Sequence, residues 1–133
     1  IGQITDMYVK ALADKKVLIL GHIGRTGLAF DTDALLLEAK ARDKLIELNE
    51  HSFGAGREGC VQKCRKLAER CAELGVKVSI GTDAHIACDV GKFTRVLQML
   101  EEIHFPEELI ASRDQESFLK ALKDSGVGAP EMC

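Results

Sequence analysis

Four side chains that could bind a metal ion each follow a short apolar run of the sequence. They are His22, His51, Asp83 and His85. Asp83 and His85 are two residues apart in the segment Gly-Thr-Asp-Ala-His, so both side chains can face one direction in an extended loop. A carboxylate oxygen and imidazole nitrogens suit zinc, manganese or iron. His22, Asp83 and His85 are therefore candidate metal ligands, and His51 is a further candidate.

Two arginines lie in loops close to these residues. Arg25 follows His22, and Arg57 lies in a glycine-rich loop that follows His51. The planar guanidinium group matches the geometry of phosphate oxygens. Gly24 would let the backbone approach a ligand closely. Together these residues indicate a site for a phosphorylated ligand.

Each candidate also has a purely structural interpretation, which the residue pattern alone leaves open. Asp83 could cap a turn, and His22 could be a hydrogen-bonded loop histidine. His51 could only order its loop, and Arg57 could form a solvated pair with Glu58.

Some other polar and sulfur-containing residues are better explained by structure than by ligand binding. Glu47 and Asn49 could form a polar layer inside a barrel. Three cysteines in the region 60–71 fit one stripe of a helix, which predicts core packing rather than a zinc site.

The elements that must position these residues alternate along the chain. Hydrophobic periodicity predicts helices at 3–13, 34–43, 60–74, 93–103 and 115–123, and strands at 17–20, 45–49 and 76–82. Strands that alternate with helices indicate an α/β fold with a parallel sheet and right-handed crossovers. The carboxyl ends of the strands then share one edge, where barrels build their sites. The candidate residues all fall at this edge.

The pattern also predicts which residues are buried. The continuous apolar run at 17–20 predicts a strand that is covered on both faces. Glu47 and Asn49 should lie on one face of the next strand, opposite Ile46. We expect Leu97 and Leu119 to face inward from the last two helices.

Composition excludes several classes of protein. The chain has 133 residues, 46% of them hydrophobic and 29% charged, which is typical of one soluble domain. A net charge of −3 gives no support for nucleic-acid or membrane binding. No apolar run is long enough to span a bilayer. Five cysteines, an odd number without a regular framework, favour reduced thiols and a cytoplasmic location.

Five motifs, in order along nearly the whole chain, resemble the C-terminal half of PHP-domain (polymerase and histidinol phosphatase) hydrolases, and the YcdX-like phosphatases in particular. These motifs are G-H-I-G at 21–24, I-E-L-N-E-H-S-F at 46–53, G-T-D-A-H at 81–85, D-V-G at 89–91 and F-P-E-E-L-I at 105–110. Their combination is specific, although each motif alone is not.

The resemblance implies a fold class, a reaction and a set of ligands. The fold would be α/β, with three consecutive β-α units of a distorted TIM-like (β/α)7 barrel that is incomplete in this chain. The reaction would be hydrolysis of a phosphomonoester by metal-activated water. By analogy, His22, Asp83 and His85 would bind divalent metal ions, zinc before manganese or iron. Arg57 and His51 would contact the substrate, and no catalytic residue is assigned.

The chain departs from the family pattern in ways that affect these expectations. Ile23 replaces the usual proline, and Glu50 replaces the second of two asparagines. The family's remaining ligands come from an N-terminal half whose motifs are not found in these residues. We therefore expect a fragment, with a partial PHP domain at 1–125 and a flexible tail at 126–133. It should show little activity alone and should self-associate to cover exposed strand edges.

Three hypotheses follow from this reading of the sequence. The first is a metal-dependent phosphoesterase that carries only the C-terminal part of its site, and whether the chain by itself is an enzyme stays open. The second is a non-catalytic binding or assembly module that retains a partial metal site. The third is an unrelated doubly wound domain that binds a small phosphorylated ligand.

Overall fold

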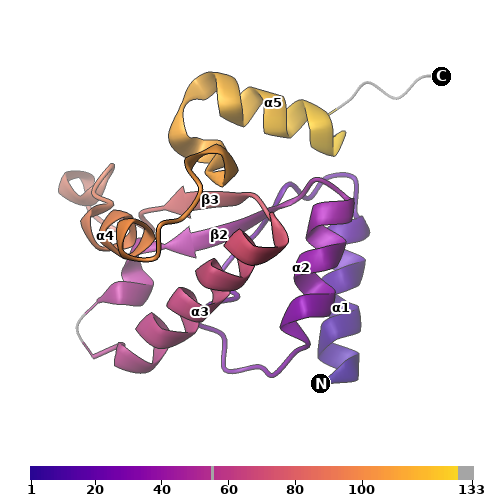
Figure 1. Cartoon of the computed structure of the whole chain (residues 1–133), viewed down its shortest axis with the longest axis horizontal. Coiled ribbons are helices and arrows are strands. Elements are labelled where there is room, and N and C mark those ends of the chain that lie inside the picture. The colour runs from indigo at the N-terminus through magenta and orange to yellow at the C-terminus, as the bar shows by residue number, and fades with distance from the viewer. Residues whose placement is uncertain (55, 129–133) are drawn as a thin grey trace.

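The computed structural model describes residues 1–54 and 56–128. Its helices and strands alternate along the chain (Figure 1). In order they are α1 (Gly2–Ala13), β1 (Ile19–Leu20), α2 (Thr32–Ala41), β2 (Leu45–Asn49), α3 (Glu58–Leu74), β3 (Val78–Gly81), α4 (Thr94–Glu102) and α5 (Gln115–Ser125). Short 3-10 turns join several of them. The tail predicted at 126–133 begins as a turn at 126–128, and its residues 129–133 lie outside the described part.

The three strands form one parallel sheet in the order β1-β2-β3. α2 connects β1 to β2, and α3 connects β2 to β3, so each connection is a β-α-β crossover. The register pairs Leu20 with Ile46, and Ile46 in turn with Val78. Because the strands are parallel, their carboxyl ends lie at the same edge of the sheet. The sheet of the described residues is open, and the larger barrel stays a prediction.

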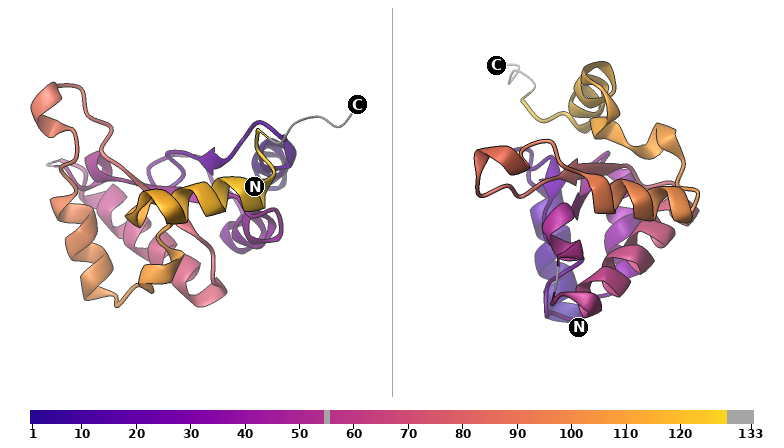
Figure 2. Two further views of the ribbon diagram at one scale, coloured as in Figure 1. Left: turned by 90° about the horizontal axis from the view of Figure 1, so that it is seen from above. Right: turned by 90° about the vertical axis from the view of Figure 1, so that its left-hand side faces the viewer.

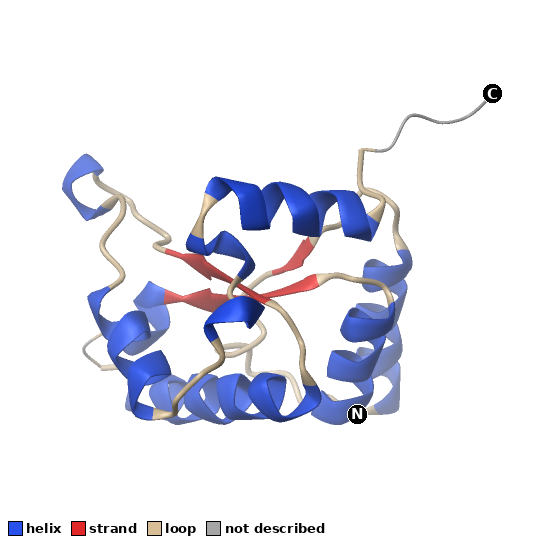
Figure 3. Cartoon of the chain, turned by 45° about the horizontal axis from the view of Figure 1, so that its top comes forward, coloured by secondary structure: helices blue, strands red, loops and turns tan. Residues whose placement is uncertain are grey.

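Helices pack on both faces of the sheet (Figures 2 and 3). α3 lies below the strands of Figure 1 and α5 lies above them, while α1 and α2 run side by side at one end. The main core joins the lower helices to Ile46 and Leu48, whereas Leu45 belongs to a second, smaller cluster with Ala121 of α5. Alternate residues of β2 therefore face opposite layers, as its sequence predicted.

Local sequence signals explain where the helices begin and end. Asp31 caps α2, its side chain accepting a hydrogen bond from Ala34 N at 3.0 Å. Gly75 ends α3 with a φ of 74°, a left-handed conformation that glycine adopts without strain. Asp114 caps α5 by accepting a hydrogen bond from Ser117 N.

Three predictions about buried faces were wrong. β1 is only two residues long and Ile19 is 37% exposed, because β1 is an edge strand of an open sheet. In α4, Leu97 is exposed and Met99 is buried instead, and in α5 Leu119 is exposed while Ala121 is buried. In both helices the neighbouring elements cover a different side of the helix from the apolar stripe that the sequence suggests.

The two edges of the sheet differ. Beyond β3, Val78 forms an isolated parallel bridge with Ile110, and Ile80 N donates to Ser112 Oγ, so the following segment covers part of that edge. The described residues provide no such pairing beyond β1. Among these residues, none of the helices is both long and apolar enough to cross a lipid bilayer.

Candidate functional site

Each strand is followed, two residues after its end, by a polar side chain at the shared edge. These residues are His22, His51 and Asp83. His22 has a φ of 62° and Asp83 a φ of 52°, a left-handed backbone conformation that is uncommon for residues other than glycine. Strained backbone of this kind clusters at functional sites. The two strand ends therefore turn sharply where the candidate ligands are found.

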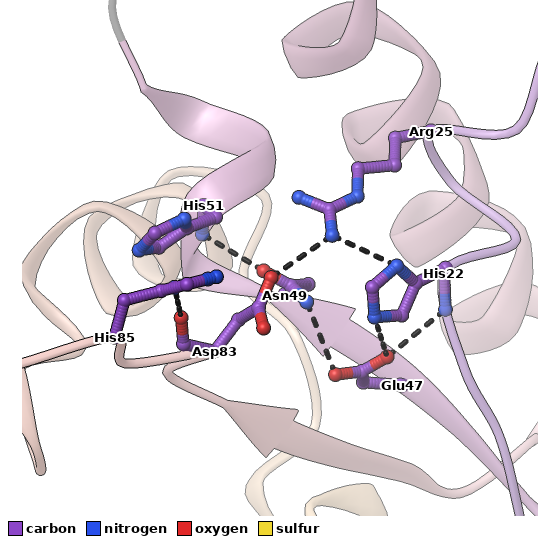
Figure 4. Close-up of polar contacts among 7 residues, drawn as sticks. All are labelled: His22, Arg25, Glu47, Asn49, His51, Asp83 and His85. Carbon is purple, nitrogen blue, oxygen red and sulfur yellow. Dashed lines mark hydrogen bonds and ion pairs between the residues drawn. The ribbon is translucent and has the colours of Figure 1, made fainter.

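The Arg25 side chain contacts both His22, which follows β1, and Asp83, which follows β3 (Figure 4). Its Nη2 atom lies 2.8 Å from His22 Nδ1 and 2.9 Å from Asp83 Oδ2. The Arg25 side chain is 16% exposed and that of His22 is 53% exposed. The guanidinium group thus fills the space between the two side chains, while the imidazole ring stays accessible to solvent.

Glu47 lies beneath this cluster and orients it. Its Oε2 atom accepts a hydrogen bond from His22 N at 2.9 Å, and its Oε1 atom accepts one from Asn49 Nδ2 at 3.2 Å. A Cβ atom at Gly21 or at Gly81 would lie 2.9 or 2.8 Å from one of these oxygens. Glu47 in this position therefore requires glycine at Gly21, just after β1, and at Gly81, the last residue of β3, and it fixes the backbone that carries His22.

The remaining two histidines form a stacked pair at the edge of the cluster. The rings of His51 and His85 have centroids 5.1 Å apart and are inclined by 23°. His85 Nδ1 lies 2.7 Å from the carbonyl oxygen of Asp83. A carbonyl only accepts hydrogen bonds, so Nδ1 carries a proton, and in the neutral ring Nε2 then keeps its lone pair. Asn49 holds His51 in place by accepting a hydrogen bond from His51 N at 2.9 Å.

The charge of Asp83 is stabilised by its surroundings. The hydrogen bond from Arg25 is the largest cause that lowers the pKa of this carboxyl group below its usual value. Asp83 is therefore an anion at neutral pH, and its Oδ2 atom is engaged by a cation of the same chain.

Arg57 does not join this cluster. It is the N-cap residue of α3 and lines a neighbouring hollow of about 480 Å³. His51, Lys92 and Arg95 line the same hollow, together with Glu50, Gly54, Thr82, Asp89 and Thr94. The two residues predicted to contact a substrate, Arg57 and His51, thus share one concave surface that carries three arginine or lysine side chains.

Gly24 is closely packed against Cys64 of α3. A Cβ atom at Gly24 would lie 2.6 Å from the sulfur of Cys64, whose Sγ is 3.5 Å from Gly24 O. This glycine therefore allows the His22 loop to pack against α3. Cys64 and Cys71 are buried in the core, as predicted from their stripe on the helix. Burial raises the pKa of both thiols, that of Cys71 to about 12.

The described residues do not form a metal centre as they are arranged. The side-chain types are suitable, since His22, Asp83 and His85 offer nitrogen and oxygen ligands. However, within residues 1–54 and 56–128 there is no group of three or more histidine, cysteine, aspartate or glutamate residues that could hold an ion. Arg25 engages one donor atom each of His22 and Asp83. The predicted ligands therefore come together in part, but a positively charged side chain stands between two of them.

Several curated proteins are similar to this chain. A protein from Clostridium acetobutylicum named "probable phosphatase" is 37% identical over 122 residues, which make up 92% of this chain and 50% of that protein. Proteins of the same name from Clostridium botulinum and Caldanaerobacter subterraneus are 34% and 35% identical, over 92% and 90% of this chain and 50% and 47% of their own lengths. The chain spans about half the length of the curated relatives it matches. No protein-family model matches it.

Glu47 is the site residue whose role the sequence did not reveal. The sequence suggests a polar layer at Glu47, whereas in the structure Glu47 contacts the first strand end directly. A signal was present in the sequence, because both neighbouring strands end in or next to a glycine, at Gly21 and Gly81. Only the register, which pairs Glu47 with Ser79 and Asn49 with Gly81, shows that these glycines leave room for the Glu47 side chain.

Proposed function

We propose that this chain contributes part of the active site of a phosphatase that hydrolyses phosphomonoesters. The observation that carries the proposal is that His22, Asp83 and His85 all follow strand ends at one edge of the parallel sheet. Glu47 accepts from His22 N, Arg25 contacts His22 and Asp83, and His85 Nδ1 contacts the carbonyl oxygen of Asp83. The name "probable phosphatase" of the similar proteins supports the same reaction class. The motifs at 21–24 and 81–85 resemble those of the PHP family, and we include membership of that family in this proposal.

The chain's own residues suit a phosphate-binding role. Arginine side chains bind phosphate oxygens through parallel hydrogen bonds. Arg57, Lys92 and Arg95 line the same hollow as His51, and Thr82, which immediately precedes Asp83, lines it too. We assign this hollow to the phosphorylated substrate. In the neutral His85 ring, Nε2 is the imidazole nitrogen with a free lone pair for a ligand at the edge of the site.

The family resemblance adds divalent metal ions to the proposal, with zinc before manganese or iron. Such ions would supply an activated water molecule. Since the donors do not converge as they are arranged here, we assign no reaction step to a metal ion. The part of the site that this chain lacks would come from the half of the relatives that it does not match, which predicts little turnover by this chain alone.

The proposal is tested by complementation with a relative. The half of the Clostridium acetobutylicum protein that this chain does not match would be co-expressed with the chain, and phosphate release from p-nitrophenyl phosphate would be measured. Activity that is lost with Asp83→Asn supports the proposal. As a control, the two halves of the relative would be combined in the same way. If these restore activity and the hybrid does not, the proposed function is wrong.

The second hypothesis, a non-catalytic binding or assembly module, is favoured by one observation. Arg25 engages a donor atom of both His22 and Asp83, which a metal-dependent enzyme would need to keep free. An inactive hybrid that still binds inorganic phosphate through the Arg57 hollow would support this module over the enzyme. Loss of phosphate binding in Arg57→Met would identify the hollow as the binding surface.

A further inference from the structure

A single nitrogen atom of Arg25 contacts two of the predicted metal ligands. Nη2 lies 2.8 Å from His22 Nδ1 and 2.9 Å from Asp83 Oδ2 (Figure 4). The side chain is 16% exposed, so it is packed between the strand ends instead of extending into solvent. Arg25 therefore connects two loops that are 58 residues apart in the sequence.

These contacts identify the lone pairs that Arg25 uses. A guanidinium group has five N–H donors and no acceptor, so His22 Nδ1 must be the acceptor and the ring proton must be on Nε2. A metal ion bound at Nδ1 would need that same lone pair. An ion bound at Asp83 Oδ2 would likewise need the oxygen that accepts from Arg25. A metal ion would lie about 2.0–2.2 Å from each ligand atom. Nη2 already occupies the space between the two atoms, so an ion can bind there only after Nη2 has moved away.

We propose that Arg25 is a built-in cation that competes with divalent metal ions for His22 and Asp83. The inference rests on the proposed function in that it takes these two residues as metal ligands. Arginine is always charged, so deprotonation cannot release it. A metal ion held between His22 Nδ1 and Asp83 Oδ2 must instead displace Nη2 from both atoms and approach a positive charge. Hydrogen bonds to charged groups contribute roughly tenfold to hundredfold to an equilibrium constant, which is the expected penalty on metal affinity.

Replacement of Arg25 tests the competition directly. Zinc affinity would be measured by isothermal titration calorimetry for the wild-type chain, Arg25→Met and Arg25→Lys. Methionine removes the charge and the donors while keeping an unbranched side chain, and it should raise zinc affinity roughly tenfold to hundredfold. Lysine keeps the charge and should give a smaller increase. Arg65→Met is the matched control, since Arg65 pairs with Glu102 on the surface and its loss changes the net charge equally.

Two further measurements make the result specific to this pair of ligands. In the double variant His22→Ala, Arg25→Met, the gained affinity should disappear. In the presence of a chelator, Arg25→Met should melt at a lower temperature than wild type, because His22 and Asp83 lose their shared partner. Added zinc should restore most of that loss in Arg25→Met and change the wild-type melting temperature much less.

The outcomes separate the inference from the proposed function. Tighter zinc binding in Arg25→Met, absent from Arg65→Met and from the double variant, supports the competition. Equal zinc affinity in wild type and Arg25→Met, lost in both when His22 is replaced, overturns the role of Arg25 and leaves the metal ligands in place. No zinc binding by wild type or Arg25→Met overturns the inference, while the complementation assay still decides the phosphatase proposal.

Discussion

Glu50 caps a helix that begins more than forty residues later in the chain. Its Oε1 atom accepts a hydrogen bond from Arg95 N at 2.9 Å, and its Oε2 atom accepts one from Val96 N at 2.8 Å. These N–H groups belong to the first turn of α4, whose own N-cap residue, Phe93, provides no side-chain acceptor. The carboxylate thus pairs two donors that the helix leaves unsatisfied and faces the positive end of its dipole.

The effect of replacing Glu50 follows from these two bonds. Glu50→Ala removes both acceptors and the charge, which should lower the free energy of unfolding by about 2 kcal/mol. Glu50→Gln keeps one oxygen as an acceptor and loses the charge, so it should cost about 1 kcal/mol. Urea unfolding followed by circular dichroism gives both values, provided that unfolding is two-state.

A matched control and a local measurement make this prediction refutable. Glu101→Gln changes a glutamate in the last turn of the same helix, where an acid opposes the dipole, so its effect should stay within about 0.5 kcal/mol. Hydrogen exchange of the Arg95 and Val96 amides should accelerate in Glu50→Ala and not in Glu101→Gln. If Glu50→Ala unfolds like the control, or if both amides stay protected, the capping interaction does not stabilise α4.

Three further outcomes are expected. Cys71, whose pKa burial raises to about 12, should resist a thiol reagent at pH 8 until the chain unfolds, whereas exposed Cys88 should react at once; fast native-state labelling of Cys71 would disprove its burial. Lys44 is 4% exposed, and burial lowers its pKa below the usual value of 10.5. As the pH approaches 10.5 from below, the folded state therefore binds fewer protons than the unfolded state. The free energy of unfolding should rise with pH in that window. Lys44→Met should abolish this rise in pH-dependent urea titrations and leave stability at pH 7 unchanged or higher by up to about 1 kcal/mol, and a clear loss there would contradict the argument. Light scattering after size-exclusion chromatography should give the mass of a dimer or larger species. Ile19→Lys, at the exposed edge strand, should weaken this association, and a monodisperse wild-type monomer would refute it.

The sequence predicted the elements well where local chemistry decides them. The start predicted at 34 and the end predicted at 74 lie within two residues of the observed helix ends, because the cap at Asp31 and the left-handed glycine at Gly75 act locally. The meeting of His22 and Asp83 at one edge followed from parallel strands alone. Buried faces were harder, because the apolar stripe of α4 does not say which neighbour covers it, and Leu97 proved exposed.

The details of the site depended on strand register and loop conformation, which the sequence does not specify. Arg25 was expected near a phosphate, but its guanidinium group contacts His22 and Asp83 because their loops turn toward it. Glu50 stands where the PHP motif that this sequence resembles has asparagine, and only the position of α4 shows that its carboxylate has a structural partner. Interactions between distant segments therefore account for most of what the sequence left open.

The close approach of Gly24 to Cys64 constrains how this protein can change by mutation. A methyl group at position 24 would lie 2.6 Å from the Cys64 sulfur, so either the loop or the Cys64 side chain would have to shift. Gly24→Ala should therefore be harmful in the native background and much better tolerated after Cys64→Ala has removed the sulfur. The two positions are epistatic, so the order of substitutions decides which variants are accessible. Because Gly24 lies in the His22 loop, substitutions at buried positions of α3 such as Cys64 can change the geometry of the strand ends.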